Sequence, residues 1–278
     1  MIVDTHTHVA CGTDDRFPTT PTGVASEWWR TGGTINELLV ELDTNEVDLA
    51  VVVQAIGAYG HDCRCAAASV HANESRCAFI ASVDMTVEDP ATAVATLLDD
   101  PPSDVRIAGV RLFGVGGHDT TWLTDGRGAA VWELASETGI VLVPTVFADR
   151  FGELRALAAT RPDVPVALDH CGFIDIFEGD GLAALLALTD TPSIHLKVTS
   201  YVLEAAERDD GDAAPLVERL ADAFGTHRLC WGSDHPQDQR HSYSEKLALA
   251  RRATRSFDRE ASDRFFGGTG NELFFDTD

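Results

Sequence analysis

The feature that most constrains this fold is an eightfold alternation of apolar, β-branched runs with segments of helical period. The first run lies at 2–6 and is followed by a helical segment at 35–46. Later pairs lie at 48–56 with 63–76, 77–84 with 90–100, 105–113 with 126–139, 140–147 with 150–161, 164–172 with 181–190, 193–201 with 214–225, and 228–236 with 244–253. Runs that are apolar throughout indicate parallel strands buried on both faces.

Eight strand and helix units within 278 residues fit a closed (β/α)8 TIM barrel better than an open doubly wound sheet. A hydrophobic content of 44% suffices for one large core. No Pro/Ser-rich linker, fixed-period repeat or low-complexity run divides the sequence. We therefore predict a single α/β domain, a (β/α)8 TIM barrel, over residues 1–278.

The chain is strongly acidic, with 45 Asp and Glu against 21 Lys and Arg and a formal net charge of -24. A surface of this sign repels phosphate backbones and anionic lipid, so we expect no nucleic-acid and no membrane partner. Only Lys197 and Lys246 are lysines. Scarce lysine with abundant acid is typical of halophilic proteins, and the alternative is an acidic mesophilic protein from a GC-rich genome, which favours Arg over Lys.

Several features indicate a cytoplasmic protein. No apolar stretch approaches the roughly 18 to 20 residues of a membrane helix, and the chain starts in a strand without a charged leader. The six cysteines are scattered without a C-x-x-C pair, so we expect reduced thiols. A zinc cluster of His61, Cys63, Cys65 and His71 is the less favoured alternative, because C-x-C is not the usual ligand spacing.

Two histidines alternate at the end of the first predicted strand. Residues two apart on a strand point to the same side, so His6 and His8 could meet one metal ion. The alternative is a pair of surface histidines at a strand end. The position of the other polar residues favours the metal.

Active sites of such barrels lie at the C-terminal ends of the strands. The polar side chains at these ends are His6, His8, Gln54, Asp84, Arg111, Asp169, His170, Lys197, Asp234 and His235. All of them are expected at one rim, which indicates a shared site. Within it His6, His8, His170 and Asp234 supply imidazole nitrogens and a carboxylate oxygen, a set that suits a zinc-type divalent metal with one position open.

The motifs "DTHTH", "LDHCG" and "LCWGSDHP" together resemble the metal-dependent amidohydrolase superfamily, of the amidohydrolase-2 type. With "GVRLF", "HLKVTS" and "GGTGNELFF", the chain is similar to the branch that contains fuconolactonase-like sugar lactonases and pyrone dicarboxylate lactonase. The resemblance covers nearly the whole chain. It implies the barrel fold and a hydrolytic site at the rim.

The resemblance also implies roles for individual residues. His6 and His8 match the ligand pair of strand one, His170 matches the mid-barrel histidine, and Asp234 matches the acid that binds metal and accepts the proton of the attacking water. Arg111 matches an arginine that faces substrate. Since two-metal members carry a carboxylated lysine where this chain has Arg111, one divalent metal is implied, zinc first and manganese as the alternative. In a metal-free variant, the three histidines would instead donate hydrogen bonds to the substrate carbonyl.

Further substrate contacts are expected from residues near the rim, each with packing or a surface role as the alternative. Gln54, Lys197 and His235 lie at predicted strand ends, whereas Tyr59 and His118 lie in loops that would roof a pocket.

The sequence thus predicts a metal-dependent hydrolase of a lactone or related cyclic ester, with a sugar-acid lactone as one candidate and Asp234 and His170 as catalytic residues. One alternative is a metal-dependent decarboxylase of the amidohydrolase-2 type. Another is a barrel that binds a small ligand without turnover. The partner is in each case a small molecule, and the sequence does not indicate an oligomeric state.

Overall fold

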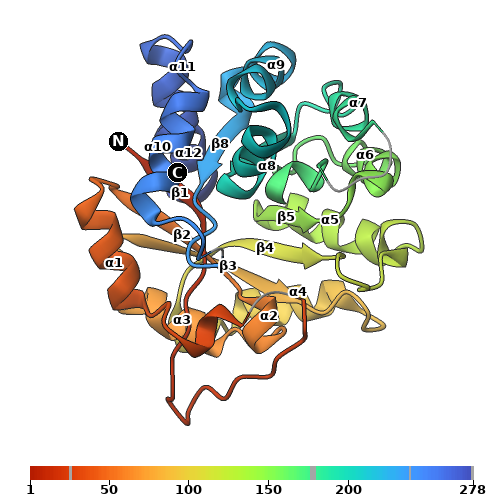
Figure 1. Ribbon diagram of the computed structural model, residues 1–278. Helices are drawn as coiled ribbons and strands as arrows, with labels where there is room; N and C mark the ends of the chain where they lie inside the picture. The colour runs from red at the N-terminus through yellow and green to blue at the C-terminus, as the bar shows by residue number, and fades with distance from the viewer. Residues whose placement is uncertain (25–26, 176–179, 238, 277–278) are drawn as a thin grey trace.

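Eight parallel strands form one sheet in the order of the sequence, with helices arranged outside them (Figure 1). The computed structural model describes residues 1–24, 27–175, 180–237 and 239–276. The strands are β1 (Val3–Thr7), β2 (Leu49–Val53), β3 (Cys77–Val83), β4 (Ile107–Phe113), β5 (Val141–Thr145), β6 (Val166–Leu168), β7 (Ile194–Thr199) and β8 (Leu229–Gly232). The predicted (β/α)8 TIM barrel is confirmed.

Each predicted helical segment contains a helix, and the helices at 56–59, 200–210, 259–263 and 269–274 were not predicted. The helices are α1 (Ile35–Thr44), α2 (Ile56–Tyr59), α3 (Arg64–His71), α4 (Pro90–Asp99), α5 (Arg127–Thr138), α6 (Phe151–Ala158), α7 (Gly181–Leu186), α8 (Ser200–Asp210), α9 (Ala214–Phe224), α10 (Tyr243–Ala253), α11 (Arg259–Asp263) and α12 (Thr269–Phe274). Short 3-10 turns are η1 (Trp28–Arg30), η2 (Pro102–Asp104), η3 (Thr121–Leu123), η4 (Ala148–Arg150), η5 (Asp169–Gly172) and η6 (Thr226–Arg228), and η7 (Arg264–Gly268) is a π turn.

Several predicted runs extend past the end of their strand, among them 48–56, where β2 ends at Val53, and 228–236, where β8 ends at Gly232. The run 193–201 was interpreted as one strand, but β7 ends at Thr199 and α8 begins at Ser200. The run 164–172 ends as a strand at Leu168, after which Asp169–Gly172 turns as η5. Ser200 and Tyr201 are compatible with a strand, and the polar Asp169 and His170 were interpreted as its rim residues, so composition did not mark the change of direction.

Hydrogen bonds join the first and last strands at the level of the rim. The amide of Asp234 donates to the His6 carbonyl at 2.8 Å, and the amide of His8 donates to the His235 carbonyl at 2.7 Å. Below them, buried Asp4 accepts from the Ser233 amide at 2.8 Å. Residues far apart in sequence are therefore fixed against each other by backbone bonds where the barrel ends meet.

The opposite end of the barrel is filled by apolar side chains. Phe274 of α12 is 1% exposed and packs inside the barrel with small strand residues such as Val3 and Ala167. The ammonium of Lys197 lies 5.8 Å above the centre of the Phe274 ring. The barrel interior thus changes from apolar to charged between Phe274 and the rim.

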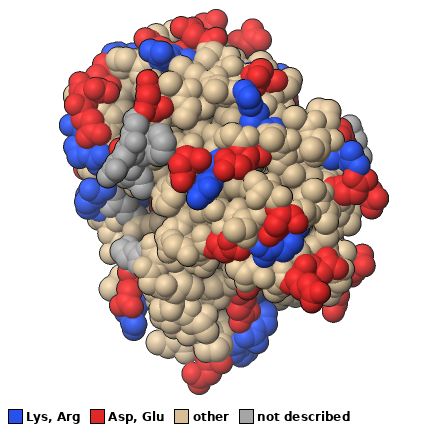
Figure 2. Space-filling view, turned by 90° about the vertical axis from the view of Figure 1, so that its right-hand side faces the viewer, with Lys and Arg blue, Asp and Glu red and all other residues tan. Residues whose placement is uncertain are grey.

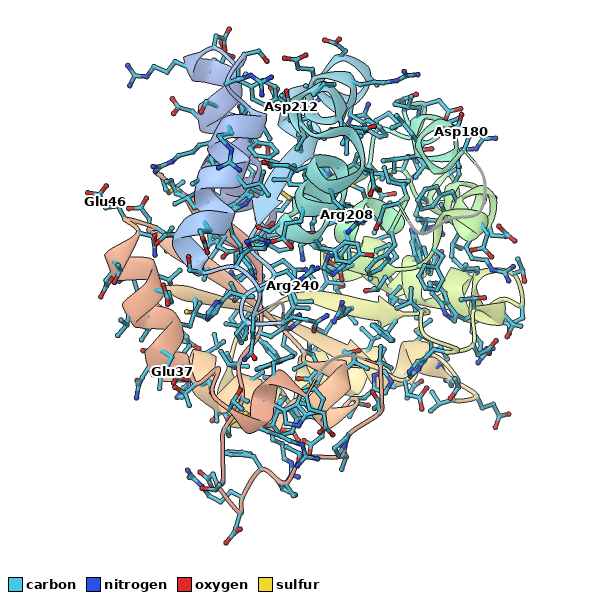
Figure 3. All side chains as sticks on the ribbon, in the orientation of Figure 1. Glu37, Glu46, Asp180, Arg208, Asp212 and Arg240 are labelled. Atoms are coloured by element: carbon cyan, nitrogen blue, oxygen red, sulfur yellow. A yellow bond between two sulfur atoms is a disulfide. The ribbon has the colours of Figure 1, made fainter. Side chains whose placement is uncertain are left out.

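The surface carries acidic groups interleaved with arginine. Both lysines are buried, Lys197 in β7 and Lys246 in α10, so the basic groups seen in Figure 2 are arginines. In Figure 3 the labelled Glu37, Asp180 and Asp212 lie among the outer helices and their loops, away from the strands. Some acids also cap helices, since Asp180 accepts from the Ala183 amide at the start of α7.

The expectation that all cysteines are reduced was wrong for one pair. Cys11, which follows β1, is joined by a disulfide to Cys65 of α3, 54 residues away. The long loop after β1 passes beside α3, which the sequence could not indicate. The same bond removes Cys65 from the alternative zinc cluster, and Cys63 is buried with its thiol donating to the Ser82 carbonyl.

Across the described chain, no helix combines the length and apolar character that crossing a bilayer requires.

Candidate active site

Two imidazoles lie at the end of β1, both buried. His8 Nδ1 donates to the Val53 carbonyl at 2.8 Å, because a carbonyl can only accept, and this leaves Nε2 with a lone pair. His6 Nδ1 lies 3.1 Å from Asp169 Oδ1 and 3.0 Å from Lys197 Nζ, and the tautomer that donates Nδ1–H to Asp169 leaves Nε2 with a lone pair for a metal. Second contacts of this kind orient metal-binding histidines.

The carboxylate of Asp234 faces both imidazoles from the end of β8. Its Oδ1 lies 3.5 Å from His8 Nε2 and 3.7 Å from His6 Nε2. Among the described residues, neither His6 Nε2 nor Asp234 Oδ1 has a hydrogen-bond partner, although both atoms are buried. The backbone of Asp234 has φ 54°, a left-handed conformation that is costly for a residue with a side chain.

A second left-handed turn places His170 beside this pair. His170, Cys171, Gly172 and Phe173 have φ of 52°, 49°, 67° and 55°. Gly172 has no alternative here, because a Cβ on it would lie 2.2 Å from the Phe151 ring. The His170 ring lies 4.5 Å from that of His6, and its Nδ1 is 2.8 Å from the Thr199 hydroxyl.

Asp169 links three polar residues beneath the imidazoles. Its Oδ2 accepts from Arg111 Nε at 2.9 Å and from the Thr145 hydroxyl at 2.7 Å. Its Oδ1 accepts from Lys197 Nζ at 3.0 Å. Burial raises the pKa of Asp169, but Lys197, His6 and Arg111 lower it more, so the net pKa lies well below the ordinary value. The carboxylate compensates two buried cations.

Burial sets the charge of the imidazoles. It lowers the pKa of His170 to about 4 and that of His6 well below its usual value, with the charge of Lys197 adding to the effect on His6. Burial alone would raise the pKa of Asp234, but His170, His8 and His6 bring it below its ordinary value. At neutral pH His6 and His170 are therefore neutral and Asp234 is ionised, the protonation states that metal binding requires.

These residues fit a divalent metal. Ligand atoms around a tetrahedral zinc ion at about 2.0 to 2.2 Å lie roughly 3.4 Å apart, close to the 3.5 and 3.7 Å between Asp234 Oδ1 and the two Nε2 atoms. The unpartnered buried atoms would be satisfied by such an ion. His6, His8 and Asp234 form the compact group, whereas His170 groups with His6 and Asp169.

A cavity of 260 Å³ opens over the site. Its described lining consists of His8, Val24, Ile56, Gly57, Arg111, Phe113, Val115, Gly116, Phe147, His170, Phe173, Tyr201, Asp234 and Gln237. Arg111 contributes its guanidinium, whose Nε is held by Asp169 and whose Nη1 donates to the Gln54 carbonyl at 3.2 Å. No partner for Nη2 is found in the described part of the chain. A larger hollow of 450 Å³ between α8 and α10 contains none of the candidate metal-binding residues.

Other predicted contacts lie outside this described lining. Lys197 is fully buried below it, bonded to Asp169 and His6, because its β7 position points into the barrel rather than over the rim. The Gln54 amide donates to the carbonyls of Gly60 and Asp62, which stabilises the loop after β2.

The remaining three predicted contacts also lie outside the described lining. The Tyr59 hydroxyl accepts from the Cys11 amide at 2.9 Å, within a cluster that includes Trp28. His118 stacks edge-on against Phe113 at 5.0 Å. His235 lines a separate hollow with Glu37, and burial lowers its pKa to about 4.

Several residues that line the cavity were not predicted from the sequence. Phe147 and Phe173 follow strand ends by a few residues, and Tyr201 lies in the first turn of α8. Their positions just after β5, β6 and β7 were the available signal, but an aromatic side chain at a strand end packs in the core as readily as it lines a cavity.

Comparison with known proteins places this site in a family. The family model described as amidohydrolase matches residues 3–275, nearly the whole chain. The chain belongs to the amidohydrolase family. A curated relative of this amidohydrolase is L-fucono-1,5-lactonase from Burkholderia ambifaria, 26% identical over 170 residues. That match covers 58% of this chain and 57% of the relative.

Solved structures share the fold. An amidohydrolase from Burkholderia multivorans with bound zinc superimposes with a TM-score of 0.78 at 19% identity, covering 98% of each chain. A probable 2-pyrone-4,6-dicarboxylic acid hydrolase from Acinetobacter baumannii, with citric acid bound, gives a TM-score of 0.77 at 19% identity, again over 98% of each chain.

Proposed function

We propose that this chain is a metal-dependent hydrolase that opens a lactone or related cyclic ester. The observation that carries the proposal is the buried, ionised Asp234, whose Oδ1 faces the Nε2 atoms of His6 and His8 at the floor of a cavity. The names of the fuconolactonase and pyrone dicarboxylic acid hydrolase relatives support a lactone as the substrate class.

His6, His8 and Asp234 would hold one divalent ion, with His170 beside them, and zinc is the proposed metal because a related structure contains it. Such an ion supplies Lewis acidity and lowers the pKa of a bound water toward 7. His8 and Asp234 line the cavity, and His170 and Arg111 lie in the same lining.

The chain's own residues perform the proton transfers and the positioning. Asp234 is a carboxylate at neutral pH, so it accepts a proton from the attacking water and returns it to the leaving alkoxide. Nη2 of Arg111 donates to an oxygen of the substrate, since Asp169 holds the guanidinium by Nε. His170, neutral because burial lowers its pKa to about 4, assists at the carbonyl.

A proton-release assay tests the function. Opening of a neutral lactone yields a carboxylate and one proton without CO₂, and we expect wild-type protein loaded with zinc to show this with a member of a lactone panel. Stoichiometric CO₂ from a carboxylated substrate would instead support the decarboxylase. Binding without any turnover would support a ligand-binding barrel.

A further inference from the structure

We infer that the substrate is a lactone with a hydrophobic body and no more than one anionic group, rather than a polyhydroxylated or dicarboxylated one. This inference rests on the proposed function and assigns the chemistry of the part of the substrate that does not react. It follows from what lines the cavity and from what each lining group is already bonded to.

One side of the cavity is an apolar wall, made of Ile56, Phe113 and Val115 with Val24, Phe147 and Phe173 packed on them. These side chains form a cluster separate from the barrel core and lie at the ends of five different strands, β1, β2, β4, β5 and β6, or in the connections that follow them. Val24, Phe147 and Phe173 are only partly buried. Apolar area that faces a water-filled cavity is covered favourably by an apolar ligand.

Aromatic rings extend this wall to the reacting end. Phe173 lies edge-on to Phe147 at 5.6 Å and tilted to His170 at 4.7 Å. The Tyr201 ring lies 5.4 Å from that of Phe173, and its hydroxyl donates to Asp175 Oδ2 at 3.0 Å. Tyr201 therefore contributes mainly its ring, because the hydroxyl proton is already donated.

Polar groups in the described lining are few. His8 and Asp234 are assigned to the metal and the water and His170 to the reacting carbonyl, so Arg111 is the charged group that remains for the rest of the substrate, with the Gln237 amide also in the lining. A sugar lactone brings several hydroxyls, and each one buried without a partner costs about 1 to 3 kcal/mol. In this cavity many of the hydroxyls of such a substrate would face phenylalanine side chains, which offer no hydrogen-bond partner.

The charge of the site argues against a dicarboxylate. Arg111 is the only cationic side chain in the described lining, and it already forms an ion pair with Asp169. Its guanidinium also lies 5.0 Å over the Phe113 ring. The second nearby cation, Lys197, is fully buried below and bonded to Asp169. A second substrate carboxylate would thus be desolvated without a partner.

Three six-membered lactones test the inference in one proton-release assay. They are δ-decalactone with an alkyl chain, glucono-1,5-lactone with hydroxyls, and 2-pyrone-4,6-dicarboxylate. We expect kcat/KM for δ-decalactone to exceed both others by at least about tenfold, from the burial of its chain. Preference for the hydroxylated or dicarboxylated probe would overturn this inference and leave the proposed function intact. If none of the three lactones is hydrolysed, both this inference and the proposed lactonase function are contradicted. Turnover of a substrate that is not a lactone would then support one of the alternative functions.

A variant of the wall provides the second arm. Phe147→Asn should raise KM for δ-decalactone about 10- to 100-fold with little change in kcat, while KM for glucono-1,5-lactone stays or falls. Phe147→Leu, which keeps an apolar surface, should restore most of the affinity. Phe257→Asn is the matched control, because Phe257 packs against Phe265 outside the cavity. If Phe147→Asn changes KM equally for δ-decalactone and glucono-1,5-lactone, the apolar wall does not discriminate between the two lactones. That result would overturn the inference.

Discussion

Lys197 Nζ lies 3.0 Å from Nδ1 of His6, beneath a candidate metal ligand rather than in the cavity. Lys197→Met would keep the packing on Phe274 but leave Asp169 and His6 without the ammonium. We expect the free energy of unfolding to fall by about 3 kcal/mol and zinc affinity to fall about 10- to 100-fold. Urea denaturation and competition with a chelator measure the two effects.

Lys246→Met is the control for this experiment, since Lys246 is the other buried lysine and lies in α10. It should leave zinc affinity unchanged even if it lowers stability. Equal metal affinity in wild type and Lys197→Met would show that the ammonium does not orient His6.

Metal content gives the second prediction. The zinc-loaded protein should hold about one equivalent, and His8→Ala should lose most of it because one of the three compact ligands is gone. His170→Ala should lose less, since its imidazole groups with His6 rather than with all three. Elemental analysis after dialysis decides, with His61→Ala as a control outside the site. A His8→Ala protein that keeps its metal would exclude the proposed ligand set.

Asp234 and Arg111 should affect different kinetic constants. Asp234→Asn removes the proton acceptor and should abolish turnover, while Arg111→Met should chiefly raise KM, by about 30- to 150-fold if a charge-assisted hydrogen bond of about 2 to 3 kcal/mol is lost. Steady-state kinetics on the preferred lactone separate the two. Residual activity in Asp234→Asn near that of wild type would require another base.

Reduction of the Cys11–Cys65 disulfide should lower stability. The bond closes a loop between residues 54 apart, so its loss should reduce the free energy of unfolding by about 2 to 4 kcal/mol. Urea denaturation with and without reductant measures this. Cys11→Ser should match the reduced protein and show no further response to reductant. Identical stability of oxidised and reduced wild type would show that the link adds nothing.

Salt should stabilise the protein strongly if its acidity is halophilic adaptation. The Debye length falls from about 10 Å at 0.1 M to about 3 Å at 1 M, which screens repulsion among the 45 acidic side chains. The melting temperature should therefore rise between 0.1 and 1 M KCl. A constant melting temperature over that interval would indicate compositional drift instead.

Local patterns predicted much of this molecule, because a barrel strand is buried on both faces and must be apolar along its length. The pair His6 and His8 could be foreseen for the same reason, since alternation on a strand is a local property. The position of Lys197 was harder to predict. Its height within the barrel depends on strand stagger, and that height determines whether a side chain reaches the cavity or lies under it.

Contacts between loops could not be predicted from such local patterns. The link between Cys11 and Cys65 depends on the path of a long connection, and the apolar wall depends on where Phe147 and Phe173 emerge after their strands. The left-handed turn from His170 to Phe173 was also not visible, because positive φ is uncommon for residues other than glycine and nothing local signals it at Cys171 and Phe173.

The Phe274 side chain fills the N-terminal end of the barrel, and this determines how substrate and product would reach and leave the site. With that end filled, the proposed lactone would enter and its hydroxy acid would leave through the same opening, past Phe147 and Phe173. Product that remains bound in the cavity would exclude the next substrate molecule. The hydroxy acid product should therefore inhibit competitively with the lactone. Its release should be the rate-limiting step when the hydrophobic body of the substrate is large.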